Sequence, residues 1–224
     1  MRGLDQDQIV EAALELLDDH GLAGVTTRRV AERLGVKSAS LYWHIRDREQ
    51  LLGLLSDRIV ADARWPEPSG NWRVTTEALM SEYLRCLLEH RDAARVVAGR
   101  PPLGPNRLRG AEMLLGALLS VGMSDAEAID AGLVLTTYVV GFALERQAAE
   151  GSSPSDAVAD PDRYPTLARL SRAVPASGWA RFEEGLSLIL DGLASRLPAK
   201  NVARAAAVTE SVANDKDQKG TEID

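Results

Sequence analysis

The chain has 224 residues and a formal net charge of -7. Hydrophobic residues make up 45% of it and charged residues 26%, which is typical of a globular protein rather than a disordered one. The single cysteine, Cys86, excludes an internal disulfide framework and favours a reducing compartment. No uninterrupted apolar run approaches the roughly 18 residues that a membrane span needs, and the first residues are too polar for a signal peptide. We therefore expect a cytoplasmic protein without a membrane partner.

Apolar residues at helical spacing predict a first helix over residues 4–19, which Gly21 ends with a left-handed cap. Thr26 or Thr27 can then cap the start of a second, short helix. Gly35 stops that helix.

A third helix is predicted over about residues 38–44, with Leu41 and Ile45 turned inward. Asp47, with Gln50 three residues later, has the pattern of a capping box at the start of a longer fourth helix.

The segment 65–70 contains two prolines and a glycine, which cannot continue a helix. Beyond this break the pattern predicts six further helical stretches, at about 72–90, 92–98, 106–121, 125–149, 164–173 and 178–196. No stretch alternates with a period of two residues, so the predicted fold class is all-α. The expected organisation is a three-helix head over 1–48, a helical effector-binding and dimerisation domain over 49–197, and a disordered polar tail over 198–224.

The head carries local positive charge on an acidic chain. Six basic residues and two acidic ones lie between Thr26 and Arg48. Two short helices joined at a glycine are typical of a helix-turn-helix, whose second helix presents small or polar residues to base edges in the major groove. Leu41 and Ile45 occupy the inward positions, so Tyr42 and Trp43 should point elsewhere than into the core.

Three segments carry a resemblance to a known family. They are TTRRVAERLGV over residues 26–36, LYWHI over 41–45 and the leucine pair at 51–52. Together they resemble the DNA-binding head of TetR-family bacterial repressors. Residues 85–92 and 141–147, together with Trp72, are similar to the tetracycline-repressor subclass. The resemblance implies a homodimeric, ligand-released repressor that binds operator DNA.

The residues expected to meet DNA follow from this resemblance. It implies phosphate contacts for Thr27, Tyr42 and Arg48 and a guanine-reading role for Arg28, whose fork suits that base. The full expected set consists of Thr27, Arg28, Lys37, Ser38, Ala39, Ser40, Tyr42, Trp43, His44 and Arg48. Because tetracycline repressors carry a larger amide and a proline where this chain has Ser38 and Ala39, its operator should differ.

The last helix carries an apolar strip that repeats at intervals of four, three and four residues: Phe182, Leu186, Ile189 and Leu193. Such a strip suits a partner helix across a dimer interface, and the alternative is that it packs inside its own subunit. The resemblance favours the dimer, because family members pair this helix and the helix at 125–149 in a four-helix bundle.

The remaining helices would enclose an effector pocket. Its expected lining is Arg64, Leu79, Tyr83, Val96, Val97, Arg100, Met113, Leu114, Ala117, Leu135, Thr137, Tyr138 and Glu145. In tetracycline repressors a histidine at the position of Val97 binds the magnesium of the drug chelate, and polar residues at Arg64 and Leu79 hold the drug. A valine cannot ligate a metal, so we expect no metal or other cofactor and a largely hydrophobic small-molecule effector.

The two alternatives to a repressor are an enzyme and another kind of regulator. An enzyme is disfavoured because the three histidines, His20, His44 and His90, show no spacing for a triad or a metal site. A TetR-like activator or a multi-drug regulator without one cognate ligand fits the same sequence features and stays open.

Overall fold

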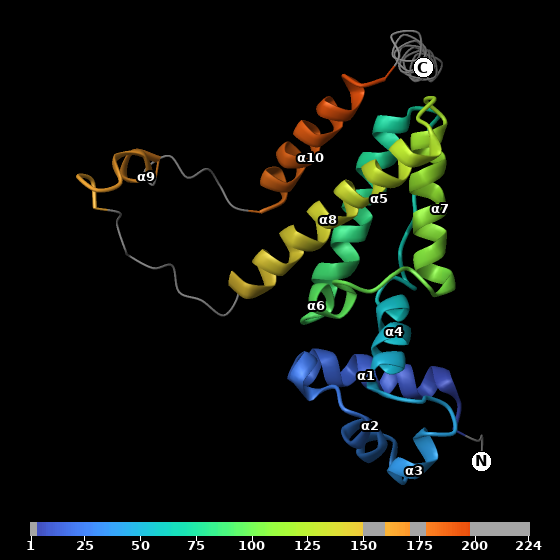
Figure 1. Cartoon of the computed structure of the whole chain (residues 1–224). Coiled ribbons are helices and arrows are strands. Elements are labelled where there is room, and N and C mark those ends of the chain that lie inside the picture. The colour runs from blue at the N-terminus through green and yellow to red at the C-terminus, as the bar shows by residue number, and fades with distance from the viewer. Residues whose placement is uncertain (1–3, 150–159, 171–177, 198–224) are drawn as a thin grey trace, which may run out of the picture.

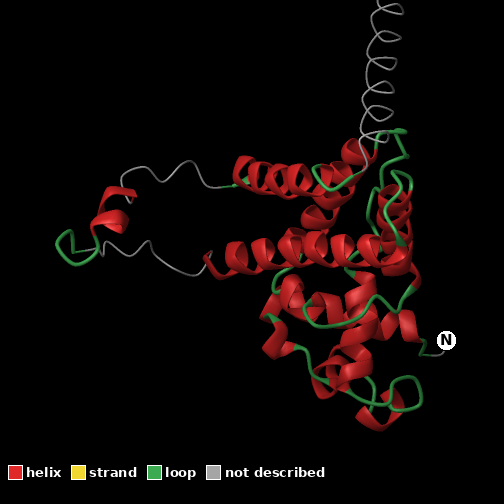
Figure 2. Cartoon of the chain, turned by 45° about the horizontal axis from the view of Figure 1, so that its top comes forward, coloured by secondary structure: helices red, strands yellow, loops and turns green. Residues whose placement is uncertain are grey.

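The computed structural model describes residues 4–149, 160–170 and 178–197 (Figures 1 and 2). Every regular element within these ranges is helical, which confirms the all-α prediction. The helices are α1 (Gln6–His20), a short 3-10 turn η1 (Leu22–Gly24), α2 (Thr27–Leu34), α3 (Ser38–Leu41), α4 (Arg48–Arg58), α5 (Trp72–Glu89), α6 (Ala93–Val97), α7 (Pro105–Leu119), α8 (Asp125–Ala149), α9 (Pro165–Leu170) and α10 (Trp179–Ala194). The expected tail over 198–224 lies outside the described residues.

Polar caps and glycines define the short helices of the head. The Thr26 hydroxyl accepts a hydrogen bond from the Arg29 backbone N–H at 3.2 Å, so Thr26 is the residue that caps α2. Gly35 ends α2 with φ 66° and ψ 26°, a left-handed conformation that glycine adopts without steric cost. Helix α3 stops at Leu41 and is therefore shorter than the predicted 38–44.

Helix α4 joins the head to the body of the molecule (Figure 1). Asp47 caps its start by accepting from the Gln50 backbone N–H at 2.8 Å. The Gln50 side chain accepts from Arg46 instead of Asp47, so only half of the predicted capping box forms. Leu51 and Leu52 in its first half are buried, and α4 packs on α1, α6 and α7.

A carboxylate on α4 caps a helix of the body. Asp57 is buried, and its oxygens accept from the Arg107 backbone N–H at 2.8 Å and the Asn106 side-chain amide at 2.8 Å. Gly104 stands at the N-cap of α7 and has no side chain to do this itself. A Cβ at Gly104 would overlap Asp57, so glycine is required for the two helices to meet. The cap therefore ties α4 to α7.

The body is built around α5, α7 and α8 (Figure 1). Helix α8 is long and apolar enough to span a membrane by length and composition, contrary to the expectation from uninterrupted apolar runs. It packs along α5, α7, α6 and α10, so its buried side is part of the protein core. Ile129, Leu133 and Val134 of α8 are nevertheless exposed.

Helix α10 packs against α8 with the apolar strip that was predicted to pair with a second subunit. Phe182 and Leu186 are 0% and 2% exposed, and the Phe182 ring stacks on Tyr138 of α8 at 5.4 Å between centroids. Ile189 and Leu193 are partly buried against the same core. The prediction is therefore wrong for Phe182 and Leu186, because the strip buries its apolar area inside its own subunit.

Replacing Asp57 with alanine should destabilise the fold. Because Asp57→Ala removes the side-chain oxygens that cap the start of α7, we expect a loss of about 1–2 kcal/mol in the free energy of unfolding. Urea denaturation followed by circular dichroism measures this loss. Asp62→Ala is the control: its exposed carboxylate pairs with Arg58, and we expect a change within about 0.5 kcal/mol. Equal effects of the two substitutions would contradict the capping role.

Candidate DNA-binding and effector sites

The head presents most of the predicted DNA-binding residues to solvent. Arg28 on α2, and Lys37, Ser38 and Ala39 at the start of α3, are exposed, while Thr27 and Ser40 are partly buried. They come from two consecutive helices that pack on one another across the turn at Gly35. The arrangement is that of a helix-turn-helix with small side chains at the front of its second helix.

Tyr42 and Trp43 follow α3 and point away from the core. Their exposed fractions are 56% and 89%, whereas Leu41 and Ile45 on either side are 0% and 1% exposed. An exposed fraction of 89% is unusual for a side chain that gains so much from burial. Two aromatic side chains, with a hydroxyl and an indole N–H, are therefore available to a partner at this end of the head.

Two arginines of the predicted set are engaged within the head. The Arg28 guanidinium pairs with Glu32 at 2.8 Å, and this bond raises the pKa of Arg28. The pair is exposed to solvent, so exchanging Glu32 for another partner of Arg28, such as a DNA base, costs little. Arg48 donates to the Val25 carbonyl at 3.0 Å and the Leu22 carbonyl at 3.2 Å, so it also holds the start of α4 against the loop before α2.

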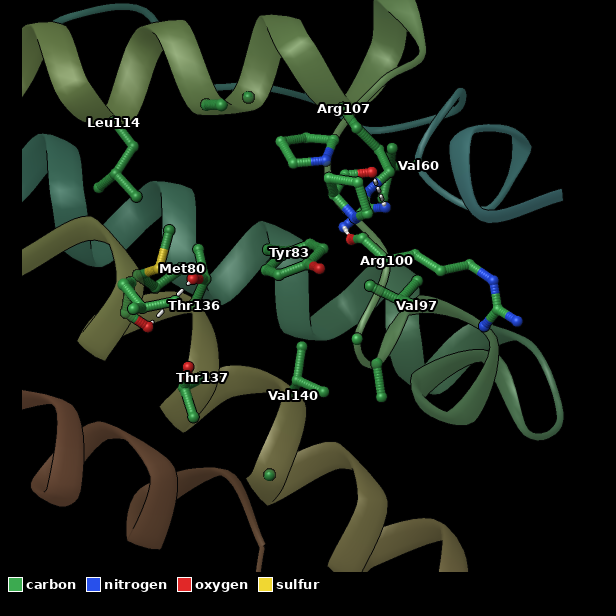
Figure 3. Close-up of a pocket in the computed structure, with 18 of the residues that line it drawn as sticks. Val60, Met80, Tyr83, Val97, Arg100, Arg107, Leu114, Thr136, Thr137 and Val140 are labelled. Atoms are coloured by element: carbon green, nitrogen blue, oxygen red, sulfur yellow. Dashed lines mark hydrogen bonds between the residues drawn. The ribbon is translucent and has the colours of Figure 1, made fainter. Parts of the chain in front are cut away.

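A large pocket opens in the body between α5, α7 and α8 (Figure 3). Its volume is about 680 Å³, within the range of sites for organic molecules. Most of its lining is apolar, and the lining consists of Val60, Trp65, Met80, Tyr83, Val97, Ala98, Gly99, Arg100, Pro101, Pro102, Arg107, Gly110, Ala111, Leu114, Leu133, Thr136, Thr137, Val140, Gly141 and Leu144.

Five of the residues expected to line the effector site lie in this lining: Tyr83, Val97, Arg100, Leu114 and Thr137. Six others lie outside it: Arg64, Leu79, Met113, Ala117, Tyr138 and Glu145. Arg64 and Glu145 are exposed, and Leu79 is fully buried in the core. Tyr138 turns toward α10, where its hydroxyl donates to the Phe182 carbonyl at 3.0 Å. The core residues Val96 and Leu135 are likewise outside the lining.

The sequence reading missed several lining residues, of which Arg107 and Trp65 matter most. The Trp65 indole lies against Gly110 of α7, where a Cβ would meet it at 2.9 Å. The small residues Gly110 and Ala111 could have indicated a cavity here, because they leave room beside the helix. Arg107 was missed because its place at the pocket depends on the turn after Arg100-Pro-Pro, which has no helical period.

One end of the pocket is polar. Tyr83 is buried, and this burial raises the pKa of its phenol while the nearby Arg107 guanidinium acts in the opposite sense. Figure 3 shows Arg107 and Tyr83 beside one another, with Leu114, Met80 and Thr137 at the other end. The pocket therefore combines apolar walls with one group of hydrogen-bond donors.

The same end of the pocket is bonded to α4. Arg100 donates to Glu49 of α4 at 2.9 Å and to the Val96 carbonyl at 2.6 Å. Arg107 donates to the Ser56 hydroxyl of α4 at 3.2 Å. Because α4 also forms part of the core of the head, a rearrangement of these arginines can move α4 and, through it, the helices of the head.

A metal site of the tetracycline-repressor kind does not fit this pocket. Val97 lines it with an isopropyl group, and Glu145 lies elsewhere on the surface. Within the described ranges, no three His, Cys, Asp or Glu side chains gather in a way that could hold a metal ion.

Comparisons with known proteins agree with this architecture. Residues 9–55 match "Bacterial regulatory proteins, tetR family", and residues 66–197 match "Tetracyclin repressor-like, C-terminal domain". The tetracycline repressor protein class A from transposon 1721 of Escherichia coli is 34% identical over 210 residues, which cover 90% of this chain and 96% of that protein.

Two solved structures show similar proteins with ligand and with DNA. ActR of Streptomyces coelicolor in complex with actinorhodin has a TM-score of 0.79 and 33% identity, covering 89% of this chain and 100% of that chain. BioQ with its double-stranded DNA operator has a TM-score of 0.66 and 30% identity, covering 85% of this chain and 98% of that chain. With a helix-turn-helix head, an effector-sized pocket and family matches over both parts, this chain belongs to the TetR family of ligand-responsive transcriptional regulators.

Proposed function

We propose that this protein is a repressor that binds a palindromic operator as a homodimer and leaves it when a small, largely apolar effector fills the pocket. The observation that carries the proposal is the bonded connection between the pocket and α4. Arg100 and Arg107 both line the pocket, and they reach Glu49 and Ser56 of the helix that supports the head. An effector that binds better to one orientation of α4 shifts the population of head positions.

The proposed DNA-contacting surface is the exposed end of the head. It consists of Thr27, Arg28, Lys37, Ser38, Ala39, Ser40, Tyr42, Trp43, His44 and Arg48. Exposure of Arg28, Tyr42 and Trp43 supports this assignment. The basic head on a chain of net charge -7 favours contact with DNA at this end and repulsion elsewhere.

The proposed dimer interface uses the outer faces of α8 and α10 instead of the buried strip. Leu188 of α10 is 65% exposed, and Ile129 and Val134 of α8 are 60% and 51% exposed. Large apolar side chains in such numbers on two packed helices favour burial against another surface. A two-fold dimer would place two heads on half-sites about one helical turn apart, or a multiple of it.

The proposed effector is apolar over most of its surface, and magnesium-tetracycline is not a match. Val97 offers no metal ligand, and the positions of the two polar anchors are occupied by Arg64 on the surface and Leu79 in the core. TetR-family regulators are generally non-enzymatic, and we assign no catalytic role. Binding to chromosomal or plasmid DNA would place the protein in the bacterial cytoplasm.

Removal of the Arg28 guanidinium should relax sequence preference. We expect Arg28→Ala to weaken operator binding by an order of magnitude or more, while binding to random DNA changes less, because a guanine-reading fork contributes mainly to base discrimination. Fluorescence anisotropy with operator and scrambled duplexes at one fixed salt concentration measures both affinities. Arg109→Ala, an exposed arginine on α7, is the control and should change neither. An unchanged ratio of the two affinities in Arg28→Ala would exclude base reading by this residue.

A charge on the outer face of α10 should break the dimer. Leu188→Glu buries a carboxylate in the proposed interface, which costs several kcal/mol unless the charge is paired. Light scattering should then report the 24.2 kDa monomer in place of a dimer. Leu103→Glu, at a side chain that is 80% exposed in the loop before α7, is the matched control and should remain dimeric. A monomeric wild-type protein at micromolar concentration would refute the dimer itself.

Tetracycline with magnesium should not be an effector. We expect the operator complex to survive a titration with the drug and MgCl2, and a parallel titration with chelator to give the same curve, because the position of Val97 offers no imidazole to the metal. Electrophoretic mobility shift of the operator duplex reads this out. Release of DNA that the chelator abolishes would show that other residues hold the metal, and the proposed pocket chemistry would be wrong.

A further inference from the structure

The charged side chains of the effector pocket are both arginines. Arg100 and Arg107 belong to the lining, and no aspartate or glutamate among the described residues does. Figure 3 shows that the two guanidinium groups differ in direction: that of Arg100 extends away from the cavity, while that of Arg107 lies beside Tyr83. The Arg100 charge is balanced by its ion pair with Glu49. The charge that faces the cavity is therefore that of Arg107.

Among the described residues, the hydrogen bonds of the Arg107 guanidinium go to neutral oxygens. Its terminal nitrogens donate to the Ser56 hydroxyl at 3.2 Å, the Pro101 carbonyl at 3.1 Å and the Arg100 carbonyl at 3.0 Å. Asp57 lies next to it, yet its carboxylate accepts from the Arg107 backbone N–H and not from the guanidinium. Neutral acceptors orient a cation without compensating its charge. A partly buried guanidinium in this state favours an anion from the pocket.

Tyr83 adds a second donor at the same end. It is 8% exposed, and its phenol, whose pKa burial raises, is protonated at neutral pH. The opposite end offers little competition for a charged group. Met80 and Leu114 are apolar, and the Thr136 hydroxyl is already used within α8, where it donates to the Gly132 carbonyl at 2.8 Å.

We propose, building on the effector function above, that the effector is an organic acid whose carboxylate binds the Arg107 guanidinium and the Tyr83 hydroxyl, with its apolar part between α5, α7 and α8. A guanidinium can hold a carboxylate through two parallel N–H bonds, which fixes the orientation of the ligand. The rest of the cavity contributes affinity through apolar contact. A cationic drug of the same size would meet an unfavourable charge at this end.

The test compares two probes of the same shape and different charge. Pyrenebutyrate carries a carboxylate on an apolar fluorescent ring system, and pyrenebutyramide replaces the carboxylate with a neutral amide. We expect the full-length protein to bind the acid on the order of ten- to a hundredfold more tightly, in line with a charge-assisted hydrogen bond. Ala111→Trp, which fills the cavity from α7, should abolish the fluorescence change of both probes and so locate them in the pocket.

Variants assign the preference to Arg107. Arg107→Gln should remove most of the preference for the acid and leave the affinity for the amide unchanged, and Arg107→Lys should restore part of it. Arg109→Gln, two positions along α7 on an exposed side chain, should behave as wild type. Tyr83→Phe deletes one hydroxyl and should lower the affinity for the acid alone by about fivefold. Circular dichroism confirms that each variant is folded.

The possible results separate the two proposals. Equal binding of acid and amide, unaffected by Arg107→Gln, would overturn the carboxylate assignment while the apolar effector pocket stands. A preference for the acid that persists in Arg107→Gln would overturn the role of this residue, and the other arginine of the lining would be implicated. Failure of both probes to bind in the pocket would overturn the effector function together with the carboxylate.

Discussion

The geometry of the whole molecule depends on how α4 is shared between two cores. Its first turns bury Leu51 and Leu52 against the head, and its last turn places Asp57 at the start of α7. A buried carboxylate without partners is costly, so Asp57 stays where backbone and amide N–H groups satisfy it. This requirement fixes α7 relative to α4, and with it one wall of the pocket. The head and the effector site are thereby parts of one mechanical system, although they are far apart in the chain.

The arginines between the pocket and α4 have two roles: they hold neighbouring segments together, and they line the pocket. A bound ligand competes with the first role. Arg107 holds the loop after α6 through the Pro101 carbonyl, reaches Ser56 of α4, and faces the cavity. Hydrogen bonds of a guanidinium are directional, so a ligand that takes its N–H groups takes them from one of these partners. A ligand need not displace α4 directly. It is sufficient that the ligand weakens the bonds of Arg107 in one position of α4 more than in another. A sensor of this type responds to charge placement as well as to size.

Local patterns were sufficient to predict most of the fold. The caps and glycines of the head follow from residue chemistry, and Thr26 and Gly35 adopt the predicted roles. The exposure of Trp43 also followed from the sequence, because Leu41 before it and Ile45 after it already fill the inward positions. The long helices of the body were predicted from their helical periodicity, because an apolar stripe repeats every three to four residues whatever it packs against.

What the stripe packs against is a tertiary property, and there the sequence was not enough. The strip that contains Phe182 has the spacing of a helix interface, and that spacing is the same whether the partner helix is α8 of the same subunit or a helix of another. The lining of the effector site likewise depends on tertiary packing that the sequence does not specify. Resemblance placed Arg64 and Leu79 in the pocket, but a side chain lines a cavity only if the helix rotation and the neighbouring volumes leave space there. Small residues such as Gly110 create that space, and they carry no chemical signature of their own. The lining of the pocket therefore depends on the position of α7, which its cap from α4 fixes, and it could not be predicted from the sequence alone.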